Sequence, residues 1–195
     1  MSEQERRPLL DYTLMADELA WVKSVHAAFA ARLGRGSGRN GGSDPKEALR
    51  AVLGAAAHAL PAPMDLSGPG PWRNGRNRHG RLVTAVFLRT AELHRHASSR
   101  TDQFPMYVIG DAEAFTIAET GRPILTPVIP GAHFHNAPGA PHAFVPQVGA
   151  PIPADWEIAF IAITPRNILE DTQGVSDAVR TAYREAVGRE PPLEA

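Results

Sequence analysis

Histidines are concentrated in one stretch of this sequence. Five of the eight histidines lie after Leu93: His94, His96, His133, His135 and His142. Residues two apart share a face on a β-strand, whereas neighbours on a helix face are three or four apart. The spacing of His94 and His96 therefore predicts two imidazoles on one side of a strand. Such a pair can bind a metal once a further ligand joins it.

The sequence contains no cysteine. This excludes disulfides, thiolate metal sites and a cysteine nucleophile. Any metal must therefore be held by nitrogen and oxygen ligands.

Charge and length narrow the class of protein. The net charge is -1, and no long stripe of Lys and Arg is present, so a nucleic-acid partner is not predicted. The run 73–81 is basic but rich in Gly and Asn, which favours a solvated loop. No apolar run approaches the ~20 residues that cross a bilayer, and the N-terminus lacks an apolar signal core. We expect a cytoplasmic protein of one domain, without a membrane partner.

The elements that position these histidines follow from periodicity. Apolar residues recur at helical spacing over 12–33, and a Gly-rich linker follows at 34–42. A second helix is predicted from Pro45 to about Ala59, because Asp44 can cap it and Glu47 completes a capping box. We expect both helices to pack against a sheet.

From residue 82 the pattern is typical of strands. They are predicted at 82–88, 104–109, 114–117, 124–129 and 156–163, and a helix capped by Ser176 at 176–187. Short strands with turns about every ten residues indicate an antiparallel sandwich or barrel. We predict three parts: a helical extension at 1–65, a β-barrel at 66–166, and a C-terminal helix and tail at 167–195.

Two segments resemble the motifs of the cupins, which are double-stranded β-helix (jelly-roll) barrels. The second cupin motif runs from a Gly through Pro-x-Gly to His, and here Gly131, Gly139 and His142 match, with Pro138 displaced by one position. Pro-Gly makes a tight turn that would deliver His142 into the barrel mouth.

The first cupin motif is His-x-His, a spacer, Glu, six residues and Gly. His94 and His96 match, and counting back six residues from Gly110 reaches Gln103, where the family has the Glu. The resemblance covers about 82–165. It implies a mainly β cupin-type barrel, preceded by two helices and followed by a C-terminal one.

The resemblance implies a metal site formed by His94, His96 and His142, with Gln103 or Asp102 as a fourth, oxygen ligand. Three neutral imidazoles suit Fe(II), the metal we predict, and also Mn, Ni, Zn or Cu. A site without the Glu is more positive, which favours a small anionic substrate bound to the metal. The alternative is a cupin that binds no metal and uses the histidines as hydrogen-bonding groups.

Further residues are candidates for contact with the substrate. Tyr107 has the strand parity of Gln103, so we expect it inside the barrel, as an acid/base or substrate-orienting group or as a core tyrosine. His133 and His135 share one face, which is either the interior or the surface. We assign His135 with Tyr107 to catalysis, and His133, Asp102 and Arg89 to second-layer or substrate contacts.

Three functions fit these features. The first is a non-haem iron oxygenase (dioxygenase) acting on a small organic acid. The second is a metal-dependent lyase, since the helices before the barrel look similar to those of the cupin lyases for dimethylsulfoniopropionate; those enzymes have Glu and Tyr where Gln103 and Pro105 stand here. The third is a non-catalytic small-molecule sensor. A homodimer is expected from the family.

Overall fold

A computed structural model describes residues 12–35, 44–56, 72–166 and 168–191. The helices are α1 (Ala16–Arg35), α2 (Pro45–Ala56), α3 (Ile168–Asp171) and α4 (Asp177–Val187). The strands are β1 (Trp72–Arg76), β2 (Leu82–Leu88), β3 (Arg95–His96), β4 (Thr101–Ile109), β5 (Ala112–Ile117), β6 (Pro123–Pro127), β7 (Phe134–Asn136), β8 (His142–Pro146), β9 (Glu157–Thr164) and β10 (Thr172–Gln173). No helix in these ranges is long and apolar enough to cross a membrane.

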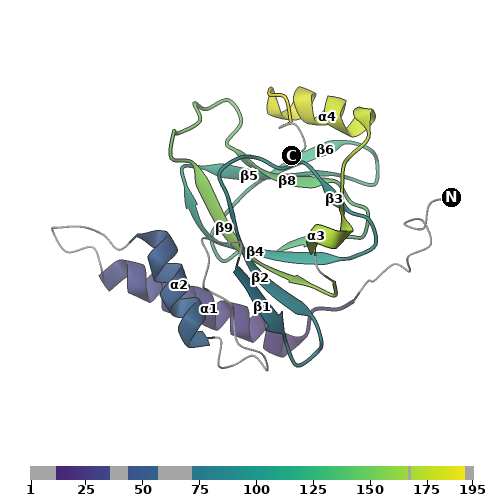
Figure 1. Ribbon diagram of the computed structural model, residues 1–195. Coiled ribbons are helices and arrows are strands. Elements are labelled where there is room, and N and C mark those ends of the chain that lie inside the picture. The colour runs from purple at the N-terminus through teal and green to yellow at the C-terminus, as the bar shows by residue number, and fades with distance from the viewer. Residues whose placement is uncertain (1–11, 36–43, 57–71, 167, 192–195) are drawn as a thin grey trace.

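Two antiparallel sheets face each other across the centre of the molecule (Figure 1). One has the strand order β1-β2-β9-β4-β7, the other has β6-β5-β8, and β3 pairs with β10 at the side. Neighbouring strands are mostly distant in sequence, as β2 and β4 both pair with β9. This topology closes a jelly-roll barrel in which strands from both halves of the chain are adjacent.

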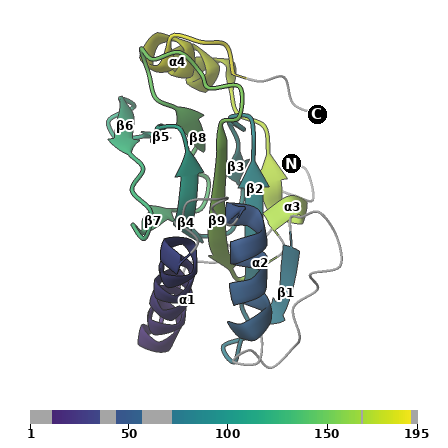
Figure 2. The same ribbon diagram turned by 90° about the vertical axis from the view of Figure 1, so that its left-hand side faces the viewer.

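Helices cover the outer faces of both sheets. α1 and α2 lie together over the five-stranded sheet (Figure 2), and their apolar residues form one core with Val83, Phe104 and Ile161. α4 covers the three-stranded sheet, where Tyr183 packs against Phe115 with ring centroids 5.1 Å apart. The molecule is therefore layered as helices, sheet, sheet and helix.

The third core fills the barrel between the sheets. It is built from Ala112, Phe144, Trp156, Ile158, Phe160 and Ala162. On β9, residues alternate strictly, so that Phe160 and Ala162 face the interior whereas Ile161 and Ile163 face the helices. This alternation fixes which residues of the paired strand β4 can reach the barrel.

Most predicted elements are confirmed. α1 begins at Ala16. α2 begins at Pro45, where the Asp44 carboxylate accepts a hydrogen bond from the amide of Lys46 at 2.9 Å, and the end predicted for this helix, Ala59, lies outside the described residues. The hydroxyl of Ser176 accepts from the amide of Val179 and starts α4, as predicted. The 34–42 linker lies almost wholly outside the described residues.

The expectation of a loop over 73–81 is wrong in its first part. β1 (Trp72–Arg76) occupies it and pairs with β2 as the edge of the five-stranded sheet. Pairing needs only backbone N–H and C=O groups, so polar side chains on an edge strand do not prevent it. The boundaries of the three predicted parts stay a prediction.

Candidate metal centre

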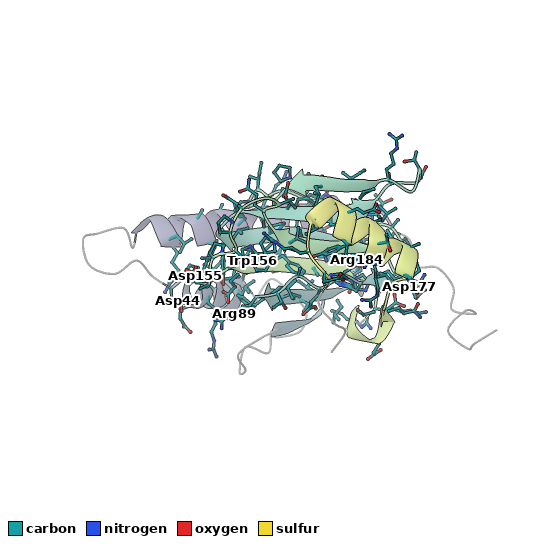
Figure 3. The ribbon with its side chains drawn as sticks, turned by 90° about the horizontal axis from the view of Figure 1, so that it is seen from above. Asp44, Arg89, Asp155, Trp156, Asp177 and Arg184 are labelled. Atoms are coloured by element: carbon teal, nitrogen blue, oxygen red, sulfur yellow. The ribbon has the colours of Figure 1, made fainter. Side chains whose placement is uncertain are left out.

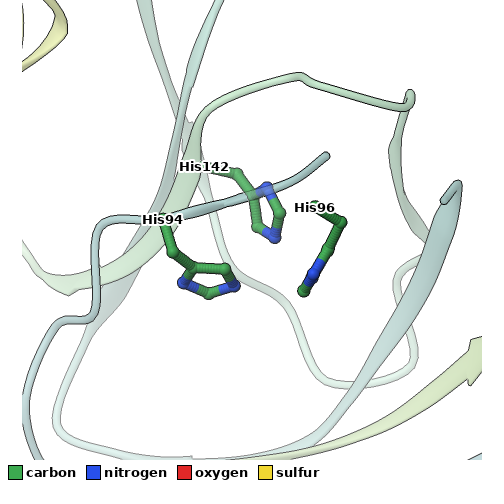
Figure 4. Close-up of side chains that lie close together, drawn as sticks. All are labelled: His94, His96 and His142. Atoms are coloured by element: carbon green, nitrogen blue, oxygen red, sulfur yellow. The ribbon is translucent and has the colours of Figure 1, made fainter. Parts of the chain in front are cut away.

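The three predicted histidine ligands meet inside the barrel (Figure 4). His142 begins β8, and His94 pairs with it in an isolated antiparallel bridge, with N–H···O distances of 3.2 and 2.9 Å. His96 lies in β3. Two backbone hydrogen bonds thus fix residues that are 48 positions apart in the sequence next to each other.

The turn before His142 joins the two motifs. Gly139 adopts a φ of 79°, and its amide donates to the carbonyl of His96 at 2.7 Å. Positive φ is readily available to glycine, which explains its place in the Pro-Gly turn. The backbone of the second motif is therefore bonded to the first motif at His96 and at His94.

The rings are close enough to share one ion. Ring centroids are 5.0 Å apart for His94 and His96, 4.5 Å for His94 and His142, and 5.1 Å for His96 and His142. One nitrogen from each ring lies within 4.8 Å of the other two. A metal with bonds of about 2.1 Å brings its nitrogen ligands to about 3.0–3.5 Å from one another, so the three rings would move closer together around an ion.

The outer nitrogens of the three rings have protein partners. Nδ1 of His94 lies 2.9 Å from the carbonyl of Glu92, Nδ1 of His142 lies 3.0 Å from that of Ala140, and Nδ1 of His96 lies 3.4 Å from Oγ1 of Thr172. Acceptors at Nδ1 fix the tautomer that leaves Nε2 with a free lone pair. This is the arrangement that metal-ligating histidines use.

The inner nitrogens of two of the rings have none. Nε2 of His96 and Nε2 of His142 are buried and lack a hydrogen-bond partner. A buried polar atom without a partner costs stability, so it calls for a ligand. The donor set, the orphaned atoms and the spacing fit a divalent metal ion.

Electrostatics keeps the imidazoles neutral. Burial lowers the pKa of His94, burial and then the neighbouring His94 lower the pKa of His96 to about 3, and burial lowers the pKa of His142 well below its usual range. A neutral imidazole offers the lone pair that a metal needs.

Gln103 lies on the interior face of β4, opposite Ala162 of β9 and Phe134 of β7. Its side-chain oxygen accepts a hydrogen bond from Nδ2 of Asn136 at 3.1 Å. The oxygen expected to be a fourth ligand is therefore used within the protein.

Asp102 is wrong as a fourth ligand, because it points out of the barrel. It pairs with Ile163, whose side chain packs against the helices. Its carboxylate contacts Nε2 of His133 at 2.7 Å and Nε of Arg100 at 3.1 Å. Successive strand residues face opposite sides, so Asp102 and Gln103 cannot both face the metal.

His133 and His135 join Asp102 outside the barrel, so of the two faces that the sequence left open the structure has the outer one. The His133 ring stacks on Phe104 at 4.7 Å, and Nδ1 of His135 lies 3.7 Å from the Asp102 carboxylate. Phe134, between them, packs into the barrel core. The register of β7 against β4 decided this, and sequence alone left it open.

Tyr107 also faces the helices, contrary to the interior position predicted for it. Pairing between β4 and β9 shifts by one residue between Pro105 and Tyr107, and this bulge reverses the alternation. The ring stacks on Phe29 of α1 at 5.8 Å, and the hydroxyl donates to Glu157 at 2.6 Å. Burial and this hydrogen bond raise the pKa of Tyr107, so it stays a protonated structural group.

Arg89 lies at the surface (Figure 3). Its side chain is 78% exposed, and Nε donates to Glu157 at 2.9 Å. Glu157 also accepts from Tyr107, which faces the helices, so Arg89 belongs to the outer layer and does not contact the three histidines.

Sequence reasoning missed the groups that orient the rings. Two of them, at Glu92 and Ala140, are backbone carbonyls, which no side-chain pattern can reveal. Thr172 comes from a segment 76 residues after His96. Asn136 was detectable in principle, because it shares the parity of Phe134 on β7.

No protein-family model and no curated protein matches the sequence. Among solved structures, an oxalate decarboxylase of Bacillus subtilis is 18% identical over 56% of this chain and 28% of its own, with a TM-score of 0.39. The oxalate decarboxylase of Lactobacillus farciminis, in a formate complex, is 17% identical over 66% of this chain and 38% of its own, with a TM-score of 0.41. Peruvianin-I, a cysteine peptidase from Thevetia peruviana latex, is 15% identical over 51% of this chain and 58% of its own, with a TM-score of 0.39.

The fold is that of the cupins. Its basis is the closed pair of antiparallel sheets with His94, His96 and His142 converging between them. The chain spans less than two thirds of the length of each of these neighbours, 28% for the Bacillus enzyme. The predicted cupin-type barrel with helices on both sides is confirmed.

Proposed function

We propose that this cupin is a mononuclear metal-dependent enzyme, an iron(II) oxygenase acting on a small organic acid. The observation that supports it best is the convergence of three neutral imidazoles whose Nε2 atoms at His96 and His142 have no partner. Their Nδ1 atoms are already held by the protein, so the site is organised before an ion arrives.

The charge of the site supports an anionic substrate. Among the described residues, the group that could hold an ion contains three histidines and no carboxylate. A divalent ion there would keep its full charge, which attracts an anion, and three protein ligands would leave coordination positions open.

The chain contributes a dry environment around these positions. Phe144, Phe160 and Ile158 belong to the apolar core between the two sheets, and all three are buried. When bound, the metal would polarise the substrate and supply a route for electrons to O₂. The protein itself would hold the acid in place and exclude water.

Metal analysis of the purified protein tests the proposal. We expect about one divalent ion per chain, retained in His135→Ala and lost in His142→Ala with unchanged folding. His135 is the matched control, because its side chain is on the outer face. Wild-type protein that takes up none of Fe, Mn, Ni, Zn or Cu would refute the proposal.

Oxygen consumption separates the alternatives. An oxygenase consumes O₂ with its acid, a lyase turns over without it, and a sensor binds without turnover. Gln103 and Pro105, where the similar lyases have Glu and Tyr, favour the oxygenase. A homodimer is part of this proposal, and light scattering of the purified protein tests it.

A further inference from the structure

Polar side chains gather on one part of the barrel's inner wall. Thr101 and Gln103 alternate with the outward-facing Asp102 on β4, and Asn136 pairs with Thr101 from β7. Further along β4 and β9 the interior positions are apolar: Pro105, Val108, Ile158 and Phe160. Thr101, Gln103 and Asn136 are hereafter called the amide-hydroxyl patch.

The patch is joined to the histidines by the backbone. Asn136 and His142 stand on either side of the turn whose Gly139 amide donates to the carbonyl of His96 at 2.7 Å. Thr101 follows His96 by five residues in the same segment. The patch and the metal centre therefore share one end of the barrel.

The hydrogen bonds within the patch leave donors free. Nδ2 of Asn136 donates a hydrogen bond to the side-chain oxygen of Gln103. The NH₂ group of the Gln103 side chain is then the part of the amide that can donate to a ligand. The side chain of Gln103 is buried, and Thr101 is fully buried with an Oγ1 that has no partner. A buried hydroxyl without a partner is costly, so this position is suited to a ligand.

The chemistry of the patch selects an anion. An amide N–H and a hydroxyl donate hydrogen bonds, and donors held at fixed positions bind a carboxylate strongly. The nearest acid in the sequence, Asp102, is turned to the other face of β4, where it contacts Arg100 and His133. A cationic group would find no carboxylate in the patch itself.

We propose that Gln103 and Thr101 bind the carboxylate of the substrate, so that Gln103 is a substrate-binding residue and not a metal ligand. The oxygens of a small carboxylate accept from Nε2 of Gln103 and Oγ1 of Thr101, and Asn136 orients the amide. This rests on the proposed function in taking the substrate to be a small organic acid.

Acetate is the probe, and zinc-loaded protein is the form to titrate, because zinc is diamagnetic. The side-chain ¹⁵NH₂ signal of Gln103 is assigned by its absence in Gln103→Leu. We expect acetate to shift this signal saturably and acetamide to leave it in place. Acetate affinity should fall about tenfold or more in Gln103→Leu, and also fall in Thr101→Val.

The controls separate binding from folding. Gln147 is exposed, so Gln147→Leu should keep wild-type acetate affinity. Zinc content should be unchanged in every variant. Thr101→Val is isosteric and removes an unpartnered hydroxyl, so its unfolding temperature should not fall, whereas a structural hydrogen bond would make it fall.

Two results would overturn the inference. One is a Gln103 amide signal that acetate does not move, and the other is loss of zinc in Gln103→Leu while Gln147→Leu retains it. If wild-type protein binds no zinc, the proposed function as a metal enzyme is contradicted, but the inference about Gln103 is not. Acetate titration of the metal-free protein then still decides the inference, since a shift of the Gln103 signal supports it and an unmoved signal refutes it.

Discussion

Replacing Asp102 by Asn tests the separation between the outer face of β4 and the metal centre. Burial raises the pKa of Asp102, but hydrogen bonds from His133, Arg100 and Tyr12 outweigh it and lower the pKa to about 2, from 3.8. The carboxylate is fully buried, so solvent screens these contacts little. Lowering the pKa from 3.8 to about 2, at about 1.4 kcal/mol per pKa unit, gives about 2.5 kcal/mol of stability.

The sign of the pH dependence follows from the lowered pKa. The stabilisation is fully present above about pH 5, where an unfolded Asp is ionised, and it is lost as the pH falls towards 2. Denaturant unfolding of wild type and Asp102→Asn should therefore differ by about 2.5 kcal/mol at pH 7 and by about half of that at pH 3.

Metal content is the second measurement on this variant. Asp102→Asn should keep its metal, because its side chain lies on the outer face of β4 and the histidines lie inside the barrel. A folded Asp102→Asn protein that loses its metal would refute the assignment of faces. A stability difference that does not change between pH 7 and pH 3 would refute the electrostatic account.

Three further variants test the packing around the site. Tyr107→Phe removes the 2.6 Å hydrogen bond to Glu157 and should cost about 1–2 kcal/mol in urea unfolding with metal content unchanged; metal loss would contradict its outer position. Gly131→Ala should cost about 1–3 kcal/mol, because φ is 86° and the new Cβ would lie 2.9 Å from Cε1 of His26; adding His26→Ala should restore only the part due to the clash. Ser176→Ala should cost about 1 kcal/mol by loss of the α4 cap, measured by thermal unfolding, and an unchanged melting temperature would count against the cap.

The sequence alone identified what is local or periodic. The spacing of His94 and His96, the Pro-Gly turn before His142 and the Ser176 cap are set by a few neighbouring residues, and the structure has all three. β2 occupies the predicted residues Leu82–Leu88, because a run of Val, Thr and Phe favours a strand wherever it pairs.

Only the tertiary structure decided which residues enter the barrel. The parity argument for Tyr107 failed at a bulge, whose effect on the alternation depends on how β4 pairs with β9. The faces of Asp102, His133 and His135 followed from the register of β7 on β4. A shift of one residue moves every side chain of a strand to the other face, so a local pattern cannot determine this choice. The sequence therefore shows which residue types could bind a metal, and strand pairing determines which of these residues lie close together.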